Sequence, residues 1–297
     1  QNEVDRDVTV GFLTARTSLT YNPFTWMSVT GLIGLDYRNT QDNQYQSPIA
    51  APSDGGFVAY RNRNVYNFNT SVVANMSQTF NEVHNVSGLF GGEYRRDYSE
   101  SFGTEGIGFT GKFFTVLDAS AEPTQAFGTN SEWRLAGYFA NVKYNYDERY
   151  FISFVGRYDG TSRFGADNRW GFFPSISGAW RISEEDFFNV SFIDELKVRA
   201  GYGTTGNSAV GNFAARGLFS VSGSYRGSSG ITPSQLANGL LGWEQASEYN
   251  VGLDYELFGG RVFGAIDLYK KQNSDLLFGL PLPSSSGFGS ITSNIGK

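Results

Sequence analysis

Six residues from Gly201 to Gly206 have the spacing of a dinucleotide-binding loop, G-x-G-x-x-G. Such a loop binds a pyrophosphate when a helix begins directly after it, because the first amides of that helix hold the phosphates. The next residues, Asn207 to Asn212, are typical of a loop, and no acidic residue lies about 20 positions further on to bind a ribose. We therefore interpret the motif as a glycine-rich strand end that enters a long loop.

Two other segments resemble known kinds of binding site. Gly106 to Lys112 resembles a phosphate-binding loop, but Phe113 stands where Ser or Thr must hold magnesium. The acidic run from Glu184 to Asp186 lacks the spaced Asp/Asn-Gly pattern of a calcium loop and is interpreted as a solvated turn, although it could bind a hard cation.

His84 is the single histidine, and a chain without cysteine offers it no partner for a transition-metal site. We expect it at the rim or in the lumen, beside a turn at Asn81-Glu82. A Ser-His-Asp arrangement needs no proximity in sequence, yet no nucleophile-elbow motif accompanies this histidine. The sequence thus predicts no catalytic residue, no cofactor and no metal site, and a protein that is not an enzyme.

Composition sets the fold class. The 297 residues include 37 glycines, 26 phenylalanines and 17 tyrosines, with a net charge of -6 and no cysteine. Aromatic residues suit strands, whereas glycine, serine and asparagine are poor in helix interiors, so we expect an all-β chain. The acidic balance argues against a nucleic-acid partner. The lack of cysteine fits export through an oxidising periplasm, and no apolar run reaches the length of about 18 residues that a transmembrane helix needs.

Apolar and polar residues alternate along many segments. Tyr249, Val251 and Leu253 fall on one face of a strand, and Asn250 and Asp254 on the other. The same reading predicts lipid-facing side chains at Tyr138, Val142, Ile152, Phe154, Val198, Val251, Leu253 and Ile266. It predicts lumen-facing or plug-facing side chains at Asn141, Lys143, Arg157, Lys197, Arg199, Glu248 and Asp254.

Connection lengths distinguish a membrane barrel from a soluble sandwich. The alternation predicts strands near 8–21, 25–38, 64–80, 83–97, 132–146, 150–159, 170–182, 195–203, 247–257 and 262–271. Tight turns are expected at Asn22-Pro23, Asn81-Glu82, Asp147-Glu148 and Gly259-Gly260, and long connections at 39–63, 98–131, 160–169, 204–246 and 272–290. Short and long connections alternate, as in outer-membrane barrels with short periplasmic turns and long extracellular loops.

The strand from Trp170 to Ile182 allows a check of dimensions. Its two tryptophans, Trp170 and Trp180, share a face and lie roughly 33 Å apart along the strand at about 3.3 Å per residue. With a tilt of about 40° the rise is roughly 25 Å, the height of an outer-membrane apolar band between its aromatic girdles.

Three segments resemble the SusC/RagA family of TonB-dependent outer-membrane transporters of Bacteroidetes. The first is Arg157-Tyr158-Asp159-Gly160-Thr161-Ser162-Arg163-Phe164-Gly165, which runs on through Trp180 to Glu185. The second is Leu196-Lys197-Val198-Arg199-Ala200-Gly201-Tyr202-Gly203 with the four residues after it. The third runs from Trp243-Glu244 through Leu280-Pro281-Leu282-Pro283 to Asn294-Ile295-Gly296-Lys297. The likeness is close over 150–297 and looser before that.

The resemblance implies a segment, residues 1–297, of an antiparallel transmembrane barrel of about 22 strands with a plugged lumen. About ten to eleven strands would lie here, with the N-terminal plug and the C-terminal strands absent. It also implies TonB-driven import of oligomeric nutrients, glycans or peptides, across the bacterial outer membrane. The implied partners are TonB, which would act through the absent N-terminal region, a SusD-like surface lipoprotein as a lid, the substrate and outer-membrane lipid.

Two other functions remain open on the residues alone, a passive outer-membrane porin and a soluble all-β carbohydrate-binding protein. The substrate-binding residues are unknown, since the loop aromatics Tyr45, Tyr60, Phe109, Phe113 and Tyr225 could stack on sugars or pack on a partner. We expect 290–297 to pair with the outer side of 262–271, so that Lys297 would stop in mid-strand. We expect 8–21 to form the opposite edge.

Overall fold

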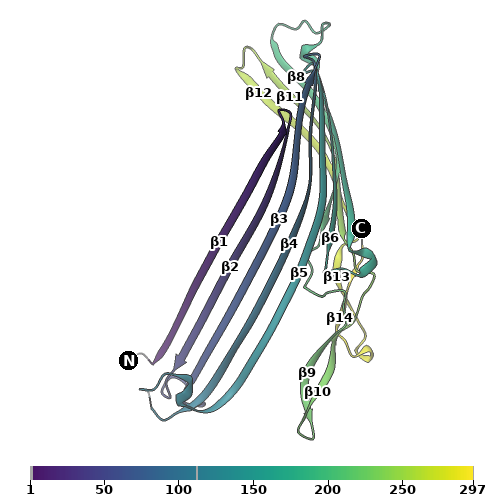
Figure 1. Ribbon diagram of the computed structural model, residues 1–297. Helices are drawn as coiled ribbons and strands as arrows, with labels where there is room; N and C mark the ends of the chain where they lie inside the picture. Colours follow the sequence, from purple (N-terminus) through teal and green to yellow (C-terminus); the bar gives the residue numbers. More distant parts are fainter. Residues whose placement is uncertain (1–2, 112, 297) are drawn as a thin grey trace. The chain divides into compact units, whose positions relative to one another are not determined.

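Ten antiparallel strands form one sheet in the computed structural model, which describes residues 3–111 and 113–296. The strand order is β1-β2-β3-β4-β5-β6-β7-β8-β11-β12 (Figure 1). The bounds are β1 (Val4–Phe24), β2 (Met27–Gln46), β3 (Phe57–Phe80), β4 (His84–Phe109), β5 (Ser120–Tyr146), β6 (Tyr150–Thr161), β7 (Trp170–Arg181), β8 (Ile193–Asn207), β11 (Glu244–Leu257) and β12 (Val262–Ser274). The predicted all-β fold and all ten expected strands are confirmed.

Two small hairpins lie in the long connections. β9 (Leu218–Tyr225) pairs with β10 (Ser228–Gln235), and β13 (Leu277–Pro281) pairs with β14 (Ser290–Asn294). Four short 3₁₀ turns complete the regular structure: η1 (Leu117–Ala119), η2 (Ala166–Asn168), η3 (Ile182–Glu184) and η4 (Ser284–Ser286). No helix among the described residues is long and apolar enough to cross a membrane.

The expected long connections 39–63 and 98–131 are wrong, because most of their residues continue the strands. β2 runs to Gln46 and β3 begins at Phe57, while β4 runs to Phe109 and β5 begins at Ser120. Only 47–56 and 110–119 lie between those strands. Residues 39–46 are polar on both faces apart from Tyr45, so the alternation that revealed the rest of β2 is absent there although the backbone remains extended.

The chain divides into two compact units. Unit 1 comprises 1–18, 32–70 and 95–134, and unit 2 comprises 19–31, 71–94 and 135–297. Unit 1 has a small core of Tyr45, Val58 and Phe109, in which the rings of Tyr45 and Phe109 meet edge to face at 5.6 Å. Its two loops are joined where the amide of Gly108 donates to the carbonyl of Asp54 at 3.0 Å.

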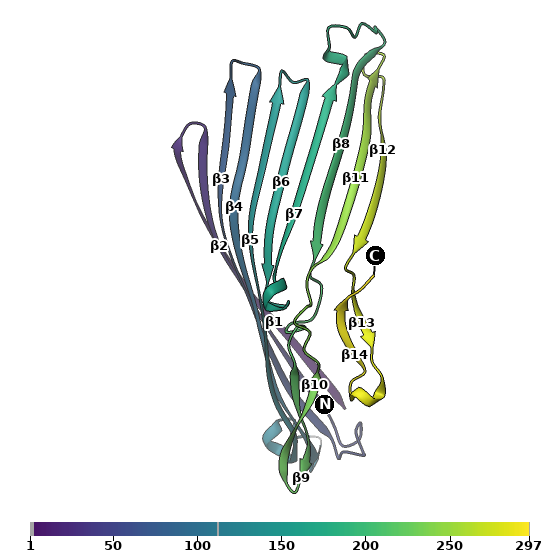
Figure 2. The same ribbon diagram turned by 90° about the vertical axis from the view of Figure 1, so that its right-hand side faces the viewer.

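In unit 2 the strands β6, β7, β8, β11 and β12 lie side by side (Figure 2). Their register assembles one apolar face, on which a cross-strand row reads Phe154, Ile176, Tyr202 and Tyr249. None of the eight side chains expected to face lipid is buried in a core. The seven expected lumen-facing side chains share the opposite, polar face. The prediction that this sheet has two distinct faces is confirmed.

Aromatic rings gather at both ends of this apolar face. The ring of Trp170 stacks on Tyr158 at 4.9 Å, and that of Trp180 stacks on Tyr150 at 6.4 Å. The two tryptophans therefore belong to separate clusters at opposite ends of β7. This is the arrangement of two interfacial girdles that the spacing of Trp170 and Trp180 predicts.

Three of the four predicted tight turns are confirmed by left-handed backbone. Asn81 and Glu82 have φ of 49° and 63°, Asp147 and Glu148 have 51° and 52°, and Gly259-Gly260 has 66° and 77°. The turn expected at Asn22-Pro23 is wrong, because β1 continues to Phe24 and reverses at 25–26. Proline lacks an amide hydrogen but is tolerated here, because β1 is an edge strand.

The short turns of unit 2 lie along one rim. Backbone hydrogen bonds join adjacent turns along this rim. The amide of Asp147 donates to the carbonyl of Val83 at 2.7 Å, and the amide of Phe258 donates to the carbonyl of Phe192 at 2.9 Å. The long connections of the same unit contact one another, because the amide of Gly165 donates to the carbonyl of Leu241 at 3.1 Å. Within unit 2, the predicted segregation of turns and loops is confirmed.

The end of the chain differs from the expectation. Ser290–Asn294 pairs with Leu277–Pro281 in a separate hairpin, and no strand among the described residues pairs with the outer side of β12. The amide of Ile295 then donates to the carbonyl of Leu276 at 2.8 Å, which holds the segment at the loops. Lys297, expected to stop in mid-strand, lies outside the described residues. The placement of 8–21 at the opposite edge is confirmed by β1.

Candidate functional site

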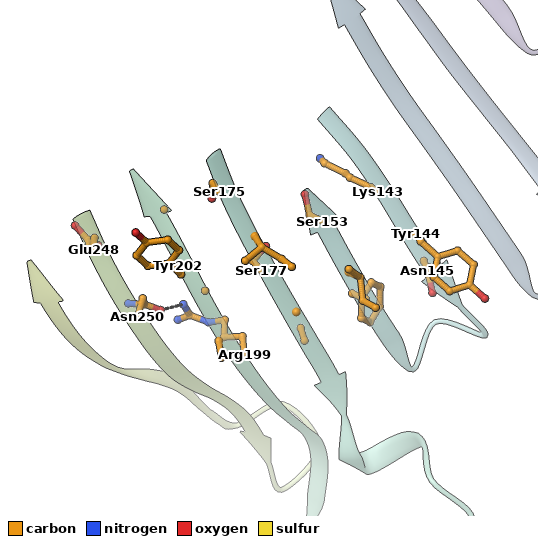
Figure 3. A pocket seen from close by; sticks show the side chains of 18 of the residues that line it. Lys143, Tyr144, Asn145, Ser153, Ser175, Ser177, Arg199, Tyr202, Glu248 and Asn250 are labelled. Atoms are coloured by element: carbon orange, nitrogen blue, oxygen red, sulfur yellow. Dashed lines mark hydrogen bonds between the residues drawn. The ribbon is translucent and has the colours of Figure 1, made fainter. Parts of the chain in front are cut away.

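A hollow of about 900 Å³ lies on the polar face of unit 2. Strands β4 to β8 and β11 line it, with Ser77 from β3 and Lys271 from β12 (Figure 3). Because side chains alternate along a strand, every second side chain of these strands lies on the polar face that bears the hollow. Cross-strand pairing then aligns those contributions in rows.

Two rows cross the hollow. The first reads Lys143, Ser153, Ser177, Gly201, Asn250 and Tyr269 from β5 to β12. The second reads Asn141, Val155, Ser175, Gly203, Glu248 and Lys271. Their centres, on β7 and β8, consist of serine and glycine alone. The hollow exists because these side chains are small, while longer side chains border it.

Glycine at 201 is not explained by packing within the wall, whereas Gly203 lies closer to Ser175. A Cβ added at Gly201 would have the Cβ of Ser177 as its nearest neighbour, at an ordinary 3.4 Å. At Gly203 the nearest atom would be the rotatable hydroxyl of Ser175 at 3.0 Å. A glycine inside a strand weakens it, and it often marks a place where a ligand or another backbone comes close.

Other glycines on the polar face do have neighbours in the wall. A Cβ at Gly252 would lie 2.5 Å from the guanidinium carbon of Arg199. A Cβ at Gly137 would overlap the carboxylate of Asp159. These glycines make room for larger side chains of the same sheet, in contrast to Gly201.

Arg199 organises the charge at one border of the hollow. Its Nε donates to Asp254 Oδ1 at 3.2 Å, its Nη2 to Asp267 Oδ2 at 2.8 Å and its Nη1 to Asn250 Oδ1 at 3.4 Å. Lys197 lies 3.8 Å from Asp254. The positive charges of Lys197 and Arg199 are therefore balanced by the carboxylates of Asp254 and Asp267.

Lys143 is different, because its row contains no carboxylate. Within the described residues no acidic side chain forms an ion pair with Lys143. Its neighbour in register on β6 is the neutral Ser153. At the far side of the hollow, Lys271 stands directly opposite Glu248. The hollow thus combines neutral hydrogen-bonding groups with charged side chains at its borders, and neither Lys143 nor Lys271 forms an ion pair among the described residues.

Nearer the loops, Arg157 joins two acidic groups on the same face. It forms ion pairs with Glu93 and, at 2.6 Å, with Asp159, which is buried. Its guanidinium carbon also lies 5.4 Å from the centre of the Phe139 ring. This network stiffens the end of β6 where the loop after it begins.

That loop contains a small core. Phe164 and Leu241 are fully buried, and the indole of Trp243 contacts the rings of Phe164 and Phe173 edge to face at 5.3 Å each. Gly165 lies against the carbonyl of Gly239 so closely that no Cβ fits. These contacts fix the connections around residues 162–169 and 236–243 to each other, which gives the β9–β10 and β13–β14 hairpins a rigid base.

The motifs that resembled chemical sites have structural roles. Gly201 to Gly206 continues β8 with no helix after it, as expected. His84 begins β4 beside the 81–83 turn, where its Nδ1 and the Tyr144 hydroxyl share a hydrogen bond of 2.8 Å. Gly106 lies within β4, and Lys112 is outside the described residues.

The acidic run lies in the turn after β7. The Tyr150 hydroxyl and the Trp180 Nε1 donate to Glu185 Oε1 at 2.5 and 2.8 Å, and these bonds hold the pKa of Glu185 below its usual range. No group of three or more acidic or histidine side chains within 3–111 and 113–296 is placed to hold a metal ion. The acidic run therefore anchors a turn to the aromatic cluster.

The expected loop aromatics differ in availability. Tyr45 and Phe109 are buried in the core of unit 1, so they cannot stack on a sugar, and Tyr60 packs against that core. Phe113 is exposed. The side chain of Tyr225 lies outside what the structure describes. The hollow itself was not predicted as a site, although the run of serine and glycine on the polar face of β7 and β8 is its visible signal.

Comparison with known proteins identifies relatives along the whole chain. The family model described as TonB dependent receptor-like, beta-barrel, matches residues 2–297. TonB-dependent receptor P39 of Formosa agariphila is 36% identical over 270 residues, which cover 89% of this chain and 26% of that protein. TonB-dependent receptor SusC of Bacteroides thetaiotaomicron is 35% identical over 218 residues, 70% of this chain and 21% of that protein.

Among solved structures, the RagAB peptide importer in its closed-closed state matches with a TM-score of 0.92 and 25% identity. That match covers 99% of this chain and 33% of the solved chain. The matches thus span about a fifth to a third of the length of these relatives. The agreement extends over both units, since nearly every residue is matched.

Proposed function

This chain belongs to the TonB-dependent receptor-like β-barrel family of the bacterial outer membrane, and we propose that it forms part of the wall of a nutrient importer. The family consists of receptors and transporters, not enzymes. The observation that carries the proposal is the two-faced sheet of unit 2. One face ends in two aromatic clusters, and the other is polar and hollowed. Such a wall separates lipid from an aqueous passage.

The wall is one segment of a larger barrel in this proposal. β1 and β12 are the two edges of the sheet among the described residues. Unpaired backbone groups in hydrocarbon each cost several kcal/mol, so further strands must close the barrel. The greater length of the relatives supports the presence of further strands. In this proposal the plug is also formed by residues of the full-length protein beyond this segment.

The proposed cargo is an oligomeric nutrient, a glycan or a peptide, with a SusD-like lipoprotein as the lid. Support comes from the relative named SusC and from the RagAB peptide importer. Within this chain, the packed base around Phe164 and Trp243 holds two hairpins at the loop end, where a lid would have to contact the barrel. In this proposal TonB acts on the plug.

Uptake measurements test the proposal. Cells that carry the full-length gene should accumulate labelled oligosaccharides or oligopeptides, and a proton-motive-force uncoupler or a tonB deletion should abolish that uptake. A passive porin would conduct the same solutes after either treatment. Uptake that continues unchanged in de-energised cells would therefore replace the importer by the porin.

A further inference from the structure

The outward face of unit 1, defined as the face that carries the exposed Ile33 and Leu35 of β2, changes in composition along the strands. Its side chains on β2 read, toward the 47–56 loop, Ile33, Leu35, Tyr37, Asn39, Gln41 and Asn43. The face thus passes from apolar through aromatic to amide side chains. We propose that the amide zone binds the saccharide headgroup of a glycolipid in the outer leaflet of the membrane. The inference requires the outer-membrane location, but not the proposed cargo.

A row of three tyrosines marks the border of the apolar zone. The ring centres of Tyr37 and Tyr66 lie 4.9 Å apart, and those of Tyr66 and Tyr98 lie 6.1 Å apart. The row therefore crosses β2, β3 and β4, which are neighbours in the sheet (Figure 1). Aromatic side chains form the girdles of outer-membrane barrels, where hydrocarbon meets headgroups. The tyrosine row indicates the level at which the headgroups begin in unit 1.

The amide band consists of the outward amide side chains beyond this row: Asn39, Gln41 and Asn43 on β2, and Asn62 and Asn64 on β3. Asn39 and Asn43 lie two and six residues beyond Tyr37, or roughly 7 and 20 Å along the strand at about 3.3 Å per residue. With a tilt of about 40° the band extends from roughly 5 to 15 Å above the tyrosines. A phospholipid headgroup layer is only about 5–8 Å thick. A saccharide headgroup is large enough to cover the whole band.

Hydrogen bonds hold the amides of the band in place. Asn39 Nδ2 donates to Asn64 Oδ1 at 2.7 Å and to Asn62 Oδ1 at 3.1 Å. The Tyr37 hydroxyl donates to Asn64 Oδ1 at 3.0 Å, and Asn64 Nδ2 donates to Glu100 Oε1 at 3.0 Å. Each amide has two N–H donors and an oxygen with two lone pairs. Groups that both donate and accept, at fixed positions, match the hydroxyl groups of a sugar.

An outer hollow of about 380 Å³ lies at the loop end of the band. Gln41, Asn43 and Asn62 line it together with Tyr60 and Phe102. Its volume is at the lower end of the about 300–1,000 Å³ of ordinary ligand sites. The ring of Phe102 is 51% exposed among these polar side chains. An aromatic ring packs on the C–H groups of a sugar while neighbouring amides bond to its hydroxyls, so this combination suits a saccharide.

The loops bound the outer hollow on the side away from the tyrosines. Tyr60 lines the hollow and also packs against the core of Tyr45, Val58 and Phe109. Leu117, from the loop between β4 and β5, packs against the same core. The outer hollow is therefore a shelf between the aromatic row and the folded base of two loops.

The charges around the band favour a neutral sugar over a phosphate. The outward side chains that β2 and β3 contribute to the band are uncharged. The charged side chains beside it on β4 and β5 are two of each sign: Arg96, Arg134, Glu100 and Glu132. Arg96 pairs with Glu132 at 2.7 Å, and Arg61, which also lines the outer hollow, pairs with Glu105 at 2.5 Å. The site thus has no net positive charge to attract an anion.

The position of the band distinguishes a glycolipid from an imported glycan. The band shares its face with Ile33 and Leu35, whose side chains face lipid in a membrane barrel. Cargo inside a barrel passes along the opposite face. A glycolipid whose acyl chains lie on the apolar zone has its headgroup at the band, because the two zones are continuous.

Binding to the full-length protein in detergent tests the site. Purified lipopolysaccharide with a short saccharide core should raise the unfolding temperature at lower concentration than a bilayer phospholipid does. The saccharide released from that lipopolysaccharide should bind at least about tenfold more weakly, because it lacks the acyl chains that bury apolar surface.

Two substitutions of exposed side chains probe the outer hollow without disturbing the sheet. Phe102→Ala should weaken lipopolysaccharide binding about tenfold through loss of the ring. Gln41→Ala should weaken it about fivefold through loss of a hydrogen bond. Gln44→Ala is the matched control, because it makes the same change on the opposite face of β2 and should leave the affinity unchanged.

Three results would overturn the inference: an unchanged affinity in Phe102→Ala, an equal affinity for phospholipid, or an equal loss in Gln41→Ala and Gln44→Ala. A change in the number of copies per complex in Phe102→Ala, with lipopolysaccharide binding intact, would assign this face to a second copy and reject the glycolipid. Nutrient uptake should be the same in Phe102→Ala and in the wild type. Uptake that is lost while lipopolysaccharide still binds would assign the outer hollow to cargo.

Discussion

At the scale of single residues, glycine decides how the loops of unit 2 fit together. Gly165 packs on the carbonyl oxygen of Gly239, while a Cβ on Gly239 itself would meet nothing within 4 Å. Gly165→Ala should therefore destabilise the full-length protein by about 1–3 kcal/mol, because backbone cannot move aside as a side chain can. Thermal unfolding in detergent measures the loss.

Gly239→Ala is the matched control, since it adds the same methyl group on the other side of the same contact. It should leave the unfolding temperature unchanged or raise it slightly. Equal effects of the two substitutions would show that Gly165 is not held as tightly as the contact indicates.

Glu185 makes the stability of the turn after β7 dependent on pH. Hydrogen bonds from Tyr150 and Trp180 lower its pKa in the folded protein below the usual 4.5. The unfolded chain thus binds the proton more readily, so the contribution of Glu185 is fully present above pH 4.5 and is lost as the pH falls through the lowered folded value. We expect the turn to loosen on acidification below 4.5.

Limited proteolysis at 182–192 across pH 3 to 6 checks this expectation. Glu185→Gln keeps an oxygen acceptor but removes the titration, so its cleavage rate should vary less over that range. Wild-type and variant profiles with the same slope would exclude Glu185 as the titrating group.

At the scale of elements, the alternation along β6 is the property most open to test. Phe154 lies on the apolar face near the middle of the wall, and Val155 is its neighbour on the polar face. Phe154→Lys should lower the free energy of unfolding in lipid vesicles by about 2–4 kcal/mol, the cost of a lysine at the bilayer midplane. Val155→Lys should cost clearly less. The reverse order would exchange the two faces.

Asn294 explains why the end of the chain stays at the loops instead of extending the sheet beside β12. Its Nδ2 donates to the carbonyls of Gly242 and Asp275 at 3.0 and 2.9 Å, and its Oδ1 accepts from the amide of Gly242 at 2.8 Å. Asn294→Ala should make local opening easier by about 1–3 kcal/mol. Hydrogen exchange at the Gly242 amide should accelerate.

Ser293→Ala serves as the control, because the neighbouring side chain forms none of these bonds. Exchange at Gly242 that is equally slow in both variants would mean that the hairpin is held by backbone pairing alone.

The elements also show what sequence reasoning can reach. Strands with one apolar face, such as β7 and β11, were predicted because burial against lipid selects every second residue. The outer half of β2 was missed because both of its faces are polar, and hydrogen bonding to β1 and β3 keeps it extended. Asn294 and Gly165 act through partners about 50 to 75 positions away. Such contacts leave no periodic signal in the chain.

At the scale of the molecule, the main feature is that the ten-stranded sheet has two open edges, β1 and β12. Within the ten-stranded sheet, β2 to β8 and β11 each have a partner on both sides, whereas β1 and β12 have one each among the described residues. β1 has exposed apolar side chains along much of its length, including Phe12 and Leu19. A long apolar edge strand is prone to pair with any available chain. The segment is thus suited to continue a sheet and poorly suited to end one.

The last prediction is that residues 1–297 expressed alone fail to form a stable barrel. Unpaired amides and carbonyls on β1 and β12 would face hydrocarbon, and each would cost several kcal/mol. The summed cost of a few such residues exceeds the usual stability of a whole domain. In detergent or vesicles, the isolated segment should migrate on an electrophoresis gel at one position whether or not it is boiled. The full-length protein should migrate as a compact form until it is heated. An isolated segment with heat-dependent mobility, together with a cross-link between cysteines introduced into β1 and β12, would show a small closed barrel and would refute both the segment proposal and the large plugged importer.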